Sequence, residues 1–68
     1  MTSPDDLFVE YVRLPDALAK AWCIKRRLHI LGCDAHLDPV LNAARLLGVE
    51  LHCAVWLRSE GLTIPVEL

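Results

Sequence analysis

Residues 32–53 read GCDAHLDPVLNAARLLGVELHC, and this stretch decides the fold. It begins with a polar loop, continues with apolar residues at helical spacing and ends in apolar alternation. Asp38-Pro39 is typical of a helix start, and Gly48 is a typical helix terminator. The stretch therefore predicts a short helix over residues 38–47 between two strands.

The segments on either side of this helix have strand patterns. Residues 28–33 form an apolar run that is too short for a capped helix. Residues 49–57 alternate strictly between apolar positions and Glu50, His52, Ala54 and Trp56. Strand, helix and strand together predict a parallel, right-handed βαβ unit.

The C-terminal residues predict a hairpin. Residues 58–61 are a loop with Gly61 at a position that favours a positive φ. Residues 62–68 alternate again, and Pro65 predicts an edge strand because proline has no N–H for a second neighbour.

The N-terminal residues predict two helices. Ser3-Pro4-Asp5-Asp6 resembles a capped helix start, which predicts a helix over residues 4–14. The alternative is a strand over residues 7–14, since several of these residues favour β structure. A second helix is predicted from Pro15 to Arg27, because this segment is rich in alanine and ends in basic residues.

The predicted fold is a small α/β (α+β) domain over residues 1–68 with element order ααβαββ. Its three-stranded mixed sheet would carry the helices on one face. The alternative is a winged helix-turn-helix, with a helix over residues 17–31, a recognition helix over 37–47 and the final hairpin as the wing. That alternative predicts a DNA-binding regulator whose nucleic-acid contacts are Arg45, Asn42, Lys25, Arg26, Arg27 and Arg58.

Composition favours an interaction protein. The chain has 68 residues, of which 54% are hydrophobic, and so small a body cannot bury them all. An exposed apolar patch is therefore expected, and such patches mark interfaces. The net charge of −2 argues against a general binder of nucleic acid or of anionic membranes.

Cysteine usage predicts a cytoplasmic protein. Three cysteines without paired spacing do not resemble a secreted disulfide framework. The polar, acidic N-terminus does not resemble a signal peptide, and no apolar run is long enough to span a membrane.

The uncovered sheet face is the predicted binding surface. Trp56 is its most informative residue, because aromatic residues are enriched at interface centres. The predicted interaction face consists of Trp56, His52, His29, Leu31, Ala54 and Pro65. A homodimer or a complex with another protein would use it.

Cysteine, histidine and acidic residues allow a weaker metal hypothesis. Cys33, His36, His52 and Cys53 have side chains that zinc prefers, but adjacent strand residues point to opposite faces. Residues 31–53 also resemble the strand, acidic loop, helix and strand of NYN/PIN-like metal-dependent nucleases, whose loop carries Gly-Asp-x-Asp. This chain departs from that pattern, since Cys33 separates Gly32 from Asp34. The resemblance implies a nuclease-like fragment as a further alternative, without its activity carried over.

The sequence shows no nucleophile motif, phosphate-binding glycine loop or CxxC pair. We therefore predict a non-enzymatic regulator or inhibitor that acts by protein–protein interaction. We expect no cofactor, no bound metal, no small-molecule substrate and no membrane partner.

Overall fold

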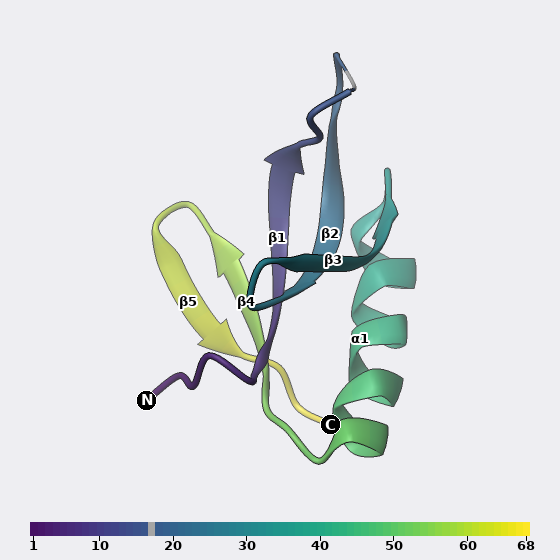
Figure 1. Ribbon diagram of the computed structural model, residues 1–68. Helices are drawn as coiled ribbons and strands as arrows, with labels where there is room; N and C mark the ends of the chain where they lie inside the picture. Colours follow the sequence, from purple (N-terminus) through teal and green to yellow (C-terminus); the bar gives the residue numbers. More distant parts are fainter. Residues whose placement is uncertain (17) are drawn as a thin grey trace.

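The computed structural model describes residues 1–16 and 18–68, and within them it shows a five-stranded mixed sheet with one helix against one face (Figure 1). The order across the sheet is β3-β2-β1-β4-β5. The elements are β1 (Leu7–Arg13), β2 (Lys20–Arg26), β3 (His29–Asp34), α1 (Leu37–Leu51), β4 (Val55–Ser59) and β5 (Leu62–Pro65).

This architecture overturns the predicted three-stranded sheet with several helices, and it also overturns the winged helix-turn-helix. The segments predicted as N-terminal helices form β1 and β2 instead, so the strand alternative for residues 7–14 is correct. The only described helix packs on the sheet, and the last hairpin belongs to the same sheet. Ala17, which the sequence placed in a helix, lies outside the described residues.

The apparent helix start at residues 3–6 is a tight turn. The backbone N–H of Asp6 donates to the carbonyl of Ser3 at 3.0 Å, which closes a four-residue turn with Pro4 at its second position. Serine followed by proline favours a β-turn as strongly as it favours a helix cap. The chain then enters β1, whose Phe8, Val9 and Tyr11 favour β structure.

Helix α1 begins before the predicted start and ends after the predicted stop. His36 is its N-cap, and Asp38 lies in its first turn rather than at the cap. Gly48 lies inside the helix, and the left-handed residue that ends it is His52, with φ 54°. The segment predicted as the start of a strand at residues 49–54 therefore contains the last helical turn.

The crossover from β3 through α1 to β4 places β4 beside β1. β1, β2 and β3 form an antiparallel meander, whereas β4 is parallel to β1. The two strands of the predicted βαβ unit are thus parallel, but β2 and β1 lie between them. The core lies between α1 and the sheet, and its buried cluster is Leu7, Val9, Ile24, Val40, Ala44 and Val55.

The C-terminal hairpin is present as predicted, but its loop has two residues rather than four, because Arg58 and Ser59 belong to β4, and its second strand ends at Pro65 rather than Leu68. Glu60 and Gly61 both have positive φ, at 51° and 79°, as a two-residue hairpin turn requires. β5 pairs only with β4, so Pro65 lies on an edge strand as expected. No helix in the described part of the chain has the length and apolar character needed to cross a membrane.

Candidate functional site

On the sheet face opposite α1, charged side chains cover the buried ring of Phe8. Alternation places Phe8, Glu10, Lys25 and Arg58 on this face, because their register partners share it. The Arg58 guanidinium carbon lies 4.0 Å from the centre of the Phe8 ring, and Phe8 is only 9% exposed. Lys25 Nζ lies 3.3 Å from Glu10 Oε1. This face is therefore more polar than the apolar surface expected from the sequence.

The structure brings together only part of the predicted interaction face. Trp56 and Pro65 are cross-strand partners on β4 and β5, on the face opposite α1. His52 caps α1 and Ala54 precedes β4, so neither belongs to that strand pair. His29 and Leu31 lie on β3, at the other edge of the sheet, and their proposed binding role stays a prediction.

The Trp56 side chain is held by a buried carboxylate. Its indole N–H donates to Asp6 Oδ2 at 2.8 Å, and the backbone N–H of Ser3 donates to the same oxygen at 2.9 Å. Asp6 is only 8% exposed. The bond from Ser3 and then the bond from Trp56 hold the pKa of the Asp6 carboxyl below its ordinary value of 3.8.

We expect Asp6→Ala to lower the free energy of unfolding by about 1–3 kcal/mol, because two N–H donors lose their acceptor. The contribution of Asp6 to the free energy of unfolding should also depend on pH. Because the pKa of the Asp6 carboxyl is lower in the folded protein than in the unfolded chain, its ionised form stabilises the fold. This stabilisation is fully present above pH 3.8 and is lost as the pH falls through the pKa of the folded state. Urea unfolding followed by tryptophan fluorescence at neutral and acidic pH measures both effects. Asp6→Asn should remove this part of the pH dependence, and an unchanged pH profile would contradict the assignment.

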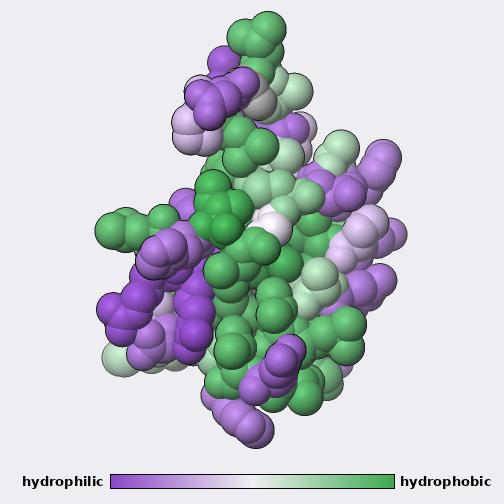
Figure 2. All heavy atoms as spheres, turned by 45° about the vertical axis from the view of Figure 1, so that its right-hand side comes forward, coloured by the Kyte–Doolittle hydropathy of each residue, from purple (hydrophilic) through white to green (hydrophobic). Residues whose placement is uncertain are grey.

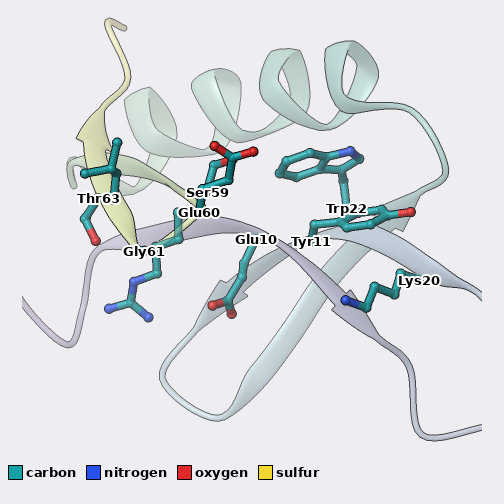
Figure 3. Close-up of a pocket in the computed structure, with 10 residues that line it drawn as sticks. Glu10, Tyr11, Lys20, Trp22, Ser59, Glu60, Gly61 and Thr63 are labelled. Carbon is teal, nitrogen blue, oxygen red and sulfur yellow. The ribbon is translucent and has the colours of Figure 1, made fainter.

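A hollow of about 540 Å³ lies at the carboxyl ends of the parallel strands β1 and β4 (Figure 3). Tyr11 and Trp22 lie side by side in it, with ring centres 5.1 Å apart, and Lys20 Nζ is 5.8 Å from the Tyr11 ring centre. Figure 3 shows Trp22 on the helix side of the sheet and Glu10 pointing to the other side. The Glu10 carboxylate and the Trp22 ring therefore lie on opposite sides of the sheet.

The candidate metal residues are separated. His36 and His52 cap opposite ends of the 15-residue helix, which holds them roughly 24 Å apart at 1.5 Å per residue. Asp34 Oδ1 accepts the backbone N–H of His36 at 2.8 Å, which is turn chemistry. Among residues 1–16 and 18–68, no group of three His, Cys, Asp or Glu side chains could hold a metal ion.

The residues proposed to contact DNA point to no common surface. Arg45 on α1 bonds to Asn42 Oδ1 and to the Glu67 carbonyl, both at 3.1 Å. Arg27 forms an ion pair of 2.7 Å with Asp5, while Arg26 Nε donates to the carbonyl of Asp5 at 2.8 Å. Lys25 and Arg58 lie on the other face of the sheet, as described above. Most of these basic side chains thus already interact with a partner in the same chain.

The β3 edge and the neighbouring flank of α1 form an exposed surface with a hollow in it, lined by both apolar and charged residues. β3 pairs only with β2, and five of its six residues are exposed. Leu31 is 46% exposed and Leu51 is 37% exposed. Both line a hollow of about 420 Å³ together with Asp5, Arg26, Arg27 and His29. Figure 2, with the α1 side turned forward, shows hydrophobic atoms gathered across the middle of this view and hydrophilic ones beside them.

The chain exposes more surface than a compact monomer of its mass. Its accessible area is 4847 Å². A folded monomer of 7.6 kDa should expose about 4300 Å². The excess is of the same order as the roughly 800 Å² that one partner buries in a standard interface.

The sequence reasoning missed the Asp6 anchor and the pairing of Cys23 with Cys33 across β2 and β3. Asp6 and Trp56 lie at opposite ends of the sequence, and no local pattern joins them. The cysteine pair depends on the β2–β3 register, which includes an irregularity next to Gly32, and an isolated glycine inside a strand pattern is the signal that could have indicated it. No protein-family model matches the chain, and searches of curated proteins and of solved structures find no match either.

Proposed function

We propose that this chain is a non-enzymatic interaction protein that binds a protein partner through the β3 edge, and that this partner is a second copy of the chain. The observation that carries the proposal is the exposed β3 strand beside the hollow that Leu31 and Leu51 line together with four polar residues. An edge strand offers unpaired N–H and C=O groups, so it can accept another strand.

Self-pairing fits the geometry of this edge. Two β3 strands can run antiparallel about a two-fold axis, because each then presents the same residues to the other. That axis would stand perpendicular to the sheet, and it would place both α1 helices on one face, with Leu51 of each helix toward the new junction. The other edge suits pairing less well, since β5 has only four residues and contains Pro65.

The side-chain contacts support a binding role over a catalytic one. Among the described residues, the side-chain hydrogen bonds join no serine, threonine or cysteine to a histidine or a carboxylate. We also propose a reducing compartment such as the cytoplasm, because three cysteines without paired spacing do not resemble a secreted disulfide framework. A regulator or inhibitor of this design would add β3 to the exposed sheet edge of a larger complex.

We expect light scattering after size-exclusion chromatography to give twice the chain mass at high concentration and a lower average mass on dilution. Leu31→Glu should weaken the dimer at least tenfold, because the two-fold axis would place two new charges near each other. The matched control is Leu62→Glu on β5, whose parent residue is 61% exposed at the opposite edge.

Circular dichroism of both variants checks that the fold is retained. A monomer mass from micromolar to near-millimolar concentration would overturn self-pairing. A dimer that is lost in Leu62→Glu but kept in Leu31→Glu would mean that the interface lies at the β5 edge, which would overturn the proposal.

A further inference from the structure

The sheet contains a pair of opposed cysteines. Cys23 on β2 and Cys33 on β3 are direct cross-strand partners. Opposed residues in antiparallel strands have Cα atoms about 4.5 or 5.5 Å apart, and both separations lie in the range that a disulfide spans. The two thiols form a side-chain hydrogen bond with their Sγ atoms 2.6 Å apart. Side-chain geometry therefore agrees with backbone register.

A local irregularity creates this pair. Near the β2–β3 turn the partners are Arg26 with His29 and Lys25 with Ile30. Continued without a break, that register would place Gly32 opposite Cys23. The register shifts by one residue between Ile24 and Lys25, which leaves Leu31 as the extra residue. The bulge thus brings the Cys33 sulfur to Cys23.

The two sulfurs differ in environment. Cys23 is fully buried, and burial, followed by its bond with Cys33, raises the pKa of its thiol to about 11. Cys33, in contrast, is exposed and lies on the edge strand β3. An oxidant in solution therefore reaches Cys33 first, and Cys23 is the partner that resolves the adduct.

We propose that Cys23 and Cys33 are a reversible dithiol site, which small-molecule disulfides of the glutathione class oxidise to an intramolecular disulfide. The Cys33 thiolate attacks one sulfur of the oxidant, which forms a mixed disulfide and releases one small thiolate. Cys23 loses its proton to solvent and attacks the Cys33 sulfur, which releases the second small thiolate. The protein loses two electrons and two protons, and the oxidant becomes two thiols. This site does not depend on the proposed self-pairing.

The experiment treats reduced full-length protein with oxidised glutathione and maps the tryptic peptides without reduction. Trypsin cuts after Lys20, Lys25, Arg27, Arg45 and Arg58, so the three cysteines fall in three different peptides. We expect one linked pair, residues 21–25 with 28–45, and an intact mass lower by two hydrogens. Dithiothreitol should reverse both changes.

Two variants that each replace one cysteine control the assignment. Cys53→Ser should keep the linkage, because its sulfur lies outside the pair, whereas Cys33→Ser should lose it. Oxidation of the Cys53→Ser protein should raise the Tm by roughly 10 °C, since the new bond closes a loop in the unfolded chain. Peptides linked through Cys53, or mixed glutathione adducts that never resolve, would overturn the proposal.

Discussion

Leu7→Ala is expected to lower the free energy of unfolding by about 3 kcal/mol, which is a loss typical of a fully buried leucine. Leu7 has no exposed surface and belongs to the core cluster between β1 and α1. A domain of this length has a total stability of roughly 3–10 kcal/mol. The variant should therefore be largely unfolded at physiological temperature if the wild type lies in the lower half of that range.

Urea unfolding followed by circular dichroism measures this loss as a lower midpoint. The matched control is Leu62→Ala, which makes the same chemical change at an exposed site on β5 and should alter stability by less than about 0.5 kcal/mol. Similar midpoints for the two variants would mean that β1 is not at the centre of the core.

Gly48→Val is expected to cost about 3 kcal/mol or more, since it forces two methyl groups and a Cβ into a filled space. A Cβ at Gly48 would lie 2.6 Å from Cγ2 of Val55, 3.2 Å from Leu68 and 3.3 Å from the Cys53 carbonyl. Val55 is 1% exposed and β-branched, so it has little freedom to move. The absence of a side chain lets α1 approach β4.

Graded variants separate this packing effect from helix propensity. Gly48→Ala gains about 1 kcal/mol of helix propensity and should still be destabilised. Val55→Ala removes the nearest methyl, so the double variant should lose less stability than the two single losses added together. Ala43→Val, on the exposed side of α1, is the control for valine in a helix and should cost about 0.5 kcal/mol. Additive losses would contradict the contact.

Local signals predicted the C-terminal half of the fold better than the N-terminal half. The hairpin was found, although its loop was predicted two residues too long, because Gly61 and Pro65 each carry a backbone constraint that acts within a few residues. The helix was found but ended too early, because a glycine that permits close packing looks the same in sequence as one that ends a helix.

The N-terminal half was wrong because its signals are ambiguous. Ser3-Pro4 fits a turn as well as a cap, and only the later strand decides between them. In β2, the apolar run Ala21–Ile24 has no strict alternation, because both of its faces are partly covered. The prediction therefore followed the helix propensity of this segment, whereas in the folded protein tertiary contacts make it a strand.

The candidate site was predicted where it rests on one hairpin and missed where it rests on long-range contacts. Trp56 and Pro65 were placed on one face because the residues of each strand alternate, although the loop between the strands was predicted with four residues rather than two. The polar cover over Phe8 was not foreseen, since Arg58 reaches it from another strand. Leu31 was included in the predicted face, but its exposure follows from its place at the sheet edge.

The parallel pairing of β1 with β4 also determines the order in which this protein can fold. The β1–β3 meander has local contacts, so it can form early, whereas Leu7 meets Val55 only after the crossover is complete. Until then, the strand that finally occupies the middle of the sheet is itself an unprotected edge. Synthesis on the ribosome therefore passes through a period in which this apolar strand is exposed, and that period ends only when β4 has emerged.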